Sequence, residues 1–233
     1  MPRFLSVLVL VIGCLPGLDV YADEKPVFNI KGWGDVIDPD KDCQVQVDDG
    51  KVMVKVPGAA HDFAAELRRW NAPRILSEIR GDFIVDVRVS GEFKPAEAST
   101  IEGRRSYNGA GILLVKDPNN YLSLQRGAVH LGDRVRQYAN FELRKDAELA
   151  ISLYELELEE RDTYLRLERR GNKVYGMASH DSIHWSSYEP IEVDFPEVIS
   201  VGVEVINSSK QPFACAFEKL ALYHKIENRA AKP

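Results

Sequence analysis

The sequence predicts an all-β protein, an antiparallel β-sandwich of two sheets. Three observations predict it: a series of short runs in which apolar residues recur at every second position, turn sequences between those runs, and little helical periodicity. The chain has 233 residues, of which 45% are hydrophobic. That length and composition suffice for one domain with its own core.

The strand-like runs continue through most of the chain. The clearest begins at Phe83, where Val85, Val87 and Val89 share one face of a half-buried strand. Similar runs cover residues 43–47, 52–56, 111–115, 121–125, 149–154, 164–168, 173–179, 198–206 and 213–222. Hairpins are expected because tight-turn sequences join several of these runs, namely Asp49-Gly50, Asp117-Pro118-Asn119-Asn120 and Gly171-Asn172.

One segment has a helical pattern. Residues 61–69 predict a helix of about two turns, and Pro73 closes the segment. With strands before and after it and no alternation of helices with strands, an α/β fold is disfavoured.

The first 22 residues have the order of a secretory signal. Arg3 precedes an apolar run from Phe4 to Leu15, and the run is followed by Val20-Tyr21-Ala22, whose small last residue suits signal peptidase. We therefore predict a signal peptide over 1–22, a linker over 23–29, the β-sandwich domain over 30–223 and a flexible tail over 224–233.

The apolar run is too short to span a membrane. Val11-Ile12-Gly13-Cys14 also fits a bacterial lipoprotein signal, in which Cys14 would carry a lipid anchor. Both interpretations predict export, to the periplasm, the cell surface or the medium.

Charge and motif content exclude several functions. The chain has 30 Lys+Arg against 36 Asp+Glu, a net charge of −6, which disfavours nucleic acid as a partner because phosphate-binding surfaces are basic. The sequence has no Gly-x-Ser-x-Gly, His-Glu-x-x-His, Cys-x-x-Cys or phosphate-binding loop motif. No cofactor is predicted, apart from a metal ion at one acidic segment.

That segment contains Asp38, Asp40 and Asp42. A tight loop could bring these alternate carboxylates together around a structural calcium ion, which requires six to eight oxygen ligands. The other interpretation is an acidic turn in which Pro39 fixes the entry to the first strand.

Three glutamates offer a catalytic hypothesis. Glu155, Glu157 and Glu159 would share one face of a strand, and a retaining glycosidase needs two carboxyl groups about 5 to 5.5 Å apart. The alternative is a solvated strand face above Leu156 and Leu158.

An ordered series of short motifs resembles a known family. The series is Asn71-Ala72-Pro73-Arg74, Gly81-Asp82-Phe83, Tyr107-Asn108-Gly109-Ala110-Gly111, Asn120-Tyr121-Leu122, Asn140-Phe141-Glu142-Leu143, 164–169, 179–185 and 213–222. It resembles a bacterial family of unknown function with a concanavalin A-like jelly-roll domain. That family is similar to the C-terminal module of some β-xylosidases and to a yeast protein named for regulation of enolase.

The resemblance has consequences for fold and site. It implies two curved antiparallel sheets, a concave face that holds sugars in carbohydrate-binding relatives, and first and last strands that are neighbours. It supplies no catalytic residues. Because export permits disulfides, and the neighbouring strands would contain Cys43 and Cys215, these two residues are candidates for a bridge, the alternative being two buried thiols.

Carbohydrate recognition combines aromatic faces with amide and charged side chains. The residues that mix those types within the family-like motifs, or near them, are Trp70, Asn71, Tyr107, Asn108, Arg126, Tyr138, Asn140 and Glu142. The sequence therefore favours an exported, lectin-like, non-catalytic carbohydrate-binding protein. A glycoside hydrolase that uses Glu155, Glu157 or Glu159 and a structural or protein-binding module of the cell envelope are the alternatives.

Overall fold

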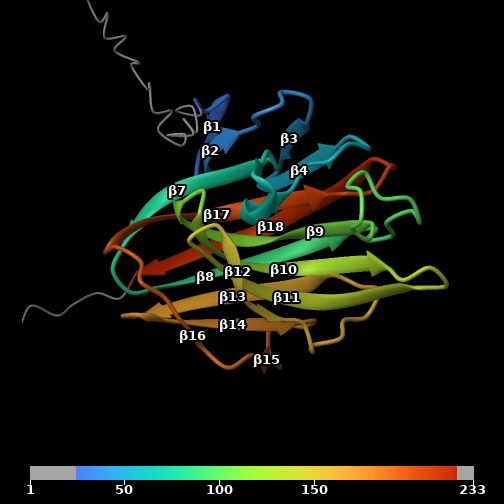
Figure 1. Ribbon diagram of the computed structural model, residues 1–233. Coiled ribbons are helices and arrows are strands. Elements are labelled where there is room, and N and C mark those ends of the chain that lie inside the picture. The colour runs from blue at the N-terminus through green and yellow to red at the C-terminus, as the bar shows by residue number, and fades with distance from the viewer. Residues whose placement is uncertain (1–24, 225–233) are drawn as a thin grey trace, which may run out of the picture.

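Two stacked β-sheets make up the molecule. The computed structural model describes residues 25–224, and within that range the chain forms two eight-stranded antiparallel sheets packed face to face (Figure 1). The predicted two-sheet β-sandwich is confirmed. The predicted signal peptide, Cys14 included, and the tail after His224 lie outside the described residues.

The first sheet carries the pocket described below. In spatial order its strands are β1 (Phe28–Ile30), β2 (Gly34–Ile37), β7 (Arg74–Arg80), β17 (Val198–Asn207), β9 (Tyr107–Asp117), β10 (Asn120–His130), β11 (Val135–Lys145) and β12 (Glu148–Leu153).

The second sheet covers the opposite side of the core. In spatial order its strands are β15 (Ser186–Ser187), β14 (Lys173–Ser179), β13 (Thr163–Arg170), β8 (Phe83–Gly91), β18 (Phe213–His224), β4 (Lys51–Val56) and β3 (Gln44–Asp48), and β16 (Ile191–Glu192) also pairs with β14.

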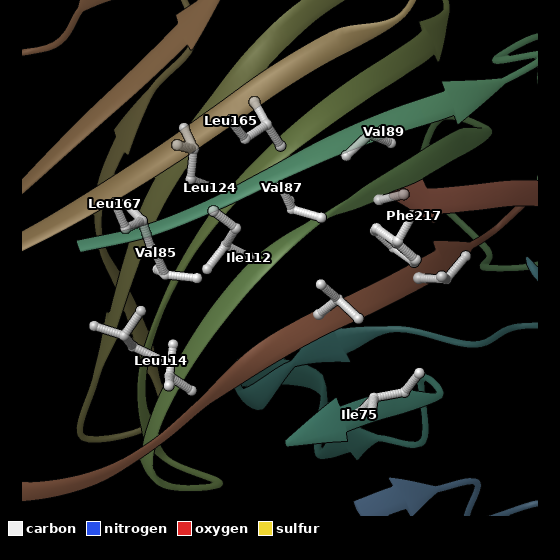
Figure 2. Packing of buried hydrophobic residues seen from close by; sticks show 14 of the residues in the cluster. Ile75, Val85, Val87, Val89, Ile112, Leu114, Leu124, Leu165, Leu167 and Phe217 are labelled. Atoms are coloured by element: carbon white, nitrogen blue, oxygen red, sulfur yellow. The ribbon is translucent and has the colours of Figure 1, made fainter. Parts of the chain in front are cut away.

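The facing sides of the sheets form one apolar core, which follows from the alternation along each strand. Each buried aliphatic side chain contributes about 1.5 to 3 kcal/mol relative to its exposed state. Figure 2 shows the packing of the two sheets through Val85, Val87, Val89, Leu165, Leu167 and Phe217 on one side and Ile75, Ile112, Leu114 and Leu124 on the other. The outer faces are thereby free to carry polar residues.

The helix predicted over residues 61–69 is wrong. The segment forms a small hairpin, β5 (Phe63–Ala64) and β6 (Arg69–Trp70), joined by a single 3₁₀ turn, η1 (Ala65–Leu67). Arg68 adopts a left-handed conformation with φ of 54°, and its N–H donates to the Ala65 carbonyl at 2.9 Å. The apolar spacing that predicts a helix instead serves a second, smaller core.

That second core lies on the outer face of the first sheet. Its buried members are Phe63, Ala65, Trp70, Ala72, Leu113, Tyr121 and Ile206. The β5–β6 hairpin thus covers part of the outer face, and the uncovered part lies beside it. No helix within residues 25–224 is long and apolar enough to cross a membrane.

Candidate functional site

A cavity of about 270 Å³ opens on the outer face of β9, β10 and β11, beside the β5–β6 hairpin. Its lining is a mixture of aromatic, amide, acidic and basic side chains. The lining residues are Asp62, Phe63, Ala64, Ile101, Arg104, Arg105, Tyr107, Ser123, Gln125, Val129, Tyr138, Asn140, Glu142, Arg144, Ile206 and Ser208. We call this cavity the pocket.

Strand register brings the polar residues together. Gln125 of β10 lies opposite Asn140 of β11, and Ser123 lies opposite Glu142. Because side chains alternate across a strand, Tyr138, Asn140 and Glu142 all point to the outer face. Two adjacent strands therefore supply much of the floor of the pocket.

The ring of Tyr107 lies over a pair of glycines. Gly109 of β9 and Gly127 of β10 are paired in register. A Cβ atom at Gly109 would lie 2.6 Å from the Tyr107 ring, and one at Gly127 would lie 2.4 Å from its hydroxyl oxygen. The absence of side chains at these two positions thus makes room for the ring, whose centroid is 6.4 Å from that of Tyr138.

Hydrogen bonds connect the pocket to a buried acid beneath it. The Tyr107 hydroxyl donates to Gln125 Oε1 at 2.7 Å, and Gln125 Nε2 donates to Glu204 Oε1. Glu204 Oε2 is buried and has no hydrogen-bond partner within the described range. Burial raises the pKa of Glu204 to about 8, so that at neutral pH this carboxyl is mostly protonated.

Charged side chains line one end of the pocket. Arg144 Nη1 donates to Glu142 Oε2 at 2.5 Å, and Ser152 Oγ donates to Glu142 Oε1 at 3.0 Å. Glu66 accepts from both Arg144 Nε and Arg104 Nη2, at 3.3 and 3.1 Å. The carboxylate of Glu142 is thereby held in a fixed orientation at the pocket.

Two further pKa values are shifted there. Burial raises the pKa of Asp62 to about 6, although its backbone contact with Phe63 and the charge of Arg144 oppose the rise. Burial also raises the pKa of the Tyr107 hydroxyl well above its ordinary value. Tyr107 therefore stays a neutral hydrogen-bonding group across the physiological range.

The structure brings together four of the eight residues that the sequence predicts for carbohydrate binding. Tyr107, Tyr138, Asn140 and Glu142 line the pocket. The sequence prediction omits Asp62, Ser123, Gln125, Arg104, Arg105 and Arg144, which line it too. Two of these residues could have been found from the sequence. Ser123 and Gln125 alternate with the apolar Leu122 and Leu124 on β10, which places them on the outer face of the strand.

Trp70 and Asn71 are predicted to bind carbohydrate, but neither lines the pocket. Trp70 belongs to the second core, where its ring centroid is 4.6 Å from that of Phe63 and 4.9 Å from that of Tyr121. Asn71 joins backbone segments instead, because its Oδ1 accepts from the Asp62 N–H at 3.1 Å and its Nδ2 donates to the Ala60 carbonyl at 2.7 Å.

Asn108 and Arg126 lie on the inner side of the first sheet, which also corrects their prediction. Asn108 is buried and donates to Asn207 Oδ1 at 2.9 Å. Arg126 is fully buried and donates to Thr163 Oγ1 at 2.7 Å, to the Glu159 carbonyl at 3.0 Å and to Gln137. Both side chains hold the fold together.

The three aspartates predicted for calcium do not converge. Asp38 is buried and accepts from the backbone N–H groups of Lys41 and Cys43, at 3.2 and 3.0 Å. Asp40 and Asp42 face His61 instead, with distances of 3.6 and 2.9 Å from their nearest carboxylate oxygens to His61 Nε2. Asp38 thus acts as a turn cap, and the predicted triad is not formed.

The disulfide between Cys43 and Cys215 is not formed either. Both residues are free thiols in the structure. Strand β4 lies between β18, which contains Cys215, and β3, which Cys43 immediately precedes. Alternate strands of a sheet are about 10 Å apart, beyond the roughly 7 Å between Cα atoms that a disulfide can bridge.

The exposure of Glu155, Glu157 and Glu159 argues against the catalytic hypothesis. Glu155, Glu157 and Glu159 lie on the exposed segment after β12 and outside the pocket. The Glu157 and Glu159 side chains are 65% and 70% exposed, in ion pairs with Arg136 at 2.7 Å and Arg161 at 3.0 Å. These carboxylates face water and do not enclose a substrate.

Comparisons with known proteins identify the fold. No family model and no curated protein matches the sequence. Among solved structures, a functionally unknown protein from Saccharomyces cerevisiae has a TM-score of 0.66 at 16% identity, over 83% of this chain and 97% of that one. A legume lectin-like domain from Entamoeba histolytica has a TM-score of 0.51 at 12% identity, over 82% of this chain and 89% of that one.

A xylan β-1,4-xylosidase from Bacillus halodurans is similar over part of its length. Its TM-score is 0.51 at 9% identity, and the match covers 78% of this chain but only 38% of that one. At such identities the likeness shows the fold alone. The chain thus shares the two-sheet β-sandwich of a lectin-like domain, of a xylosidase module and of a yeast protein whose function is unknown.

Proposed function

We propose that the protein is an exported carbohydrate-binding protein that binds the end of a glycan in the pocket without cleaving it. The observation that carries the proposal is the placement of Tyr107 and Tyr138 beside the amides of Gln125 and Asn140 and the carboxylate of Glu142. A tyrosine ring packs against the apolar face of a sugar, while the amides and the carboxylate beside it meet the sugar hydroxyls.

The polar groups suit sugar hydroxyls, each of which both donates and accepts. Asn140 offers an amide donor and acceptor, and Gln125 keeps one amide hydrogen and one lone pair beside its bonds to Glu204 and Tyr107. Glu142 offers an acceptor, and Arg144 offers donors beside it. The cavity, at about 270 Å³, is slightly smaller than the range of about 300 to 1,000 Å³ that is typical of ligand sites. A volume of this size favours a terminal sugar over an internal stretch of polysaccharide.

The fold supports the same function class. A lectin-like domain has this β-sandwich architecture, and a binding protein needs no acid and base on either side of a glycosidic bond. The contacts in the pocket are also preformed, since Tyr107, Gln125 and Glu142 are already held by intramolecular hydrogen bonds.

The binding test compares tyrosines on opposite faces of the sandwich. The purified protein and its Tyr138→Ala and Asn140→Ala variants are screened on a glycan array, with titration calorimetry on the best glycan. Tyr164→Ala is the matched control because Tyr164 lies on β13 of the second sheet. We expect wild-type protein and the control to bind one glycan class, and the pocket variants to bind it at least about tenfold more weakly.

Two results would contradict the proposal. Binding that survives both pocket variants would place the site elsewhere, and failure of wild-type protein to bind any glycan would reject the function. Export has its own test: the intact mass of the protein recovered from an expressing bacterium should correspond to a chain that begins at Asp23. A lipid-modified chain that begins at Cys14 would still be exported, whereas an uncleaved cytoplasmic chain would contradict export.

A further inference from the structure

Three potential metal ligands, Asp42, Cys43 and His61, meet where the segment before β3 approaches the segment before β5, and Asp40 lies next to His61. The His61 side chain is only 1% exposed, and its Nε2 lies 2.9 Å from Asp42 Oδ1 and 3.6 Å from Asp40 Oδ2. Cys43 Sγ lies 3.6 Å from the same Asp42 oxygen. The ligand atoms of Asp42, Cys43 and His61 all lie within 4.8 Å of one another.

Both ring nitrogens of His61 face groups that can only accept a hydrogen bond. Nδ1 is 3.3 Å from the Ala59 carbonyl oxygen, and Nε2 is 2.9 Å from Asp42 Oδ1. A neutral imidazole carries one hydrogen, so it can donate to only one of these two acceptors. A metal ion at Nε2 would satisfy both sides, because Nδ1 would keep the hydrogen for the Ala59 carbonyl and the Nε2 lone pair would bind the ion.

The thiol and the spacing of the donors favour a metal ion. Without a metal ion, Cys43 interacts only through a long hydrogen bond from its thiol to Asp42, whereas a metal ion would bind the sulfur directly, together with the imidazole and the carboxylates. Tetrahedral zinc, with bonds of about 2.0 to 2.3 Å, has ligand atoms about 3.3 to 3.8 Å apart. The two distances of 3.6 Å lie in that range, and the 2.9 Å between Asp42 and His61 would lengthen by a few tenths of an ångström. Asp40 lies outside the group of three and would have to turn toward the thiol to become the fourth ligand. Sulfur and imidazole donors suit zinc and do not suit calcium.

We propose that Asp40, Asp42, Cys43 and His61 form a zinc-binding site. Zinc would displace the thiol proton of Cys43 and bind to the lone pair of His61 Nε2. Asp40 and Asp42 are 45% and 43% exposed, so the ion can reach its ligands from solvent.

Neighbouring contacts already orient the ligands, as is typical of metal sites. The Ala59 carbonyl is placed to accept from Nδ1 when Nε2 binds the ion, and Asn71 Nδ2 donates to Asp40 Oδ2 at 2.7 Å. The His61 backbone is also paired with Asn207, through hydrogen bonds of 3.0 and 2.9 Å. The ion would therefore join the segment before β3 to the segment that provides Asp62 and Phe63 as a wall of the pocket.

The test measures binding of zinc alone, with no glycan present. Metal-free protein is titrated with zinc chloride against a chromophoric chelator, and cobalt(II) is used as a spectroscopic substitute. We expect one zinc ion per chain, no competition from calcium, and a thiolate-to-cobalt charge-transfer band. Cys43→Ser should abolish the band and weaken zinc binding at least about tenfold, and Asn71→Ala, which changes no ligand, should weaken it about tenfold.

Matched controls separate this site from other thiols and histidines. Cys215→Ala removes the buried thiol of β18, and His184→Ala removes an exposed histidine that lies 2.7 Å from Asp181. Both controls should bind zinc as wild-type protein does, with circular dichroism showing that every variant is folded without metal. Zinc affinity that is unchanged by Cys43→Ser and Asp42→Asn, or a cobalt complex without the thiolate band, would overturn the proposal in favour of a proton on His61.

Discussion

The hydroxyl of Tyr107 donates to Gln125 Oε1 across 2.7 Å while the ring lies over Gly109 and Gly127. Together the two contacts fix the position of the ring at the pocket. The hydrogen bond depends on Gln125, and the position of the ring depends on the absence of side chains at Gly109 and Gly127. A side chain can be added at a glycine without changing any polar group that would touch a ligand.

The first prediction is that Gly127→Ala displaces the Tyr107 ring. A Cβ at this position would lie 2.4 Å from the Tyr107 hydroxyl oxygen and 3.0 Å from ring atoms, so the side chain must move and lose its bond to Gln125. We expect glycan affinity to fall at least about tenfold, and the free energy of unfolding to fall by about 1 to 3 kcal/mol. Calorimetry and urea unfolding measure the two effects.

Gly176→Ala is the matched control for this prediction. A Cβ there would lie 3.0 Å from the ring of Phe141, which belongs to the main core and does not line the pocket. This variant should lose stability to a similar extent and keep its glycan affinity. Equal losses of affinity in the two variants would show that the position of Tyr107 is irrelevant to binding.

The second prediction concerns the dependence of stability on pH. Burial raises the pKa of Glu204 from 4.5 to about 8, so the folded chain holds this proton more tightly than the unfolded chain does. Its stabilising contribution is complete below about pH 4.5 and is lost as the pH rises toward 8. Glu204→Gln cannot ionise and keeps an acceptor for Gln125. Between pH 5 and pH 8 the stability of the variant relative to wild type should therefore increase, by at most about 4 kcal/mol.

Urea unfolding at several pH values measures this difference. Glu192→Gln is the control, because the Glu192 side chain is 70% exposed and its ion pair with Lys173 is 3.8 Å long. Its stability should follow that of wild type at every pH. A difference between Glu204→Gln and wild type that stays constant from pH 5 to pH 8 would mean that Glu204 is ionised in the folded protein.

The third prediction compares two tryptophans. Trp70→Ala should cost about 3 to 5 kcal/mol of stability, because the ring fills the second core and also stacks with Arg74, whose guanidinium lies 4.8 Å from its centroid. Trp185 is only half-buried and stacks with Arg166 at 4.4 Å, so Trp185→Ala should cost about 1 kcal/mol or less. Thermal unfolding distinguishes the two. Similar losses would show that the second core does not contribute to stability.

The alternation of apolar and polar residues along a strand decides how well that strand can be predicted from the sequence. Strand β8 has one apolar face and is predicted without difficulty, whereas β7 and β11 carry arginines at Arg74, Arg80, Arg136 and Arg144 that obscure the alternation. The same alternation argues against one predicted site residue. Arg126 has the parity of Leu122, Leu124 and Ala128, which face the core, so its side chain points inward.

Contacts between distant segments are what the sequence does not predict. Residues 61–69 form the β5–β6 hairpin in place of the predicted helix, and in the hairpin their apolar side chains pack on Leu113 and Tyr121 of the outer face of the first sheet. Likewise, His61 reaches Asp42 because the segment before β5 pairs with the end of β17 at Asn207. Both are tertiary effects on segments with weak local preference.

The last prediction concerns Glu155, Glu157 and Glu159. A triple variant with glutamine at all three positions should lose less than about 1 kcal/mol of stability, because the ion pairs with Arg136 and Arg161 lie at the surface. Glycan binding should be unchanged, since none of the three lines the pocket. The measurement is urea unfolding, with a reducing-end assay on the glycan that the protein binds. Release of reducing ends by wild-type protein but not by the triple variant would support the catalytic hypothesis. Such a result would mean that these exposed carboxylates act on a glycan bound outside the pocket.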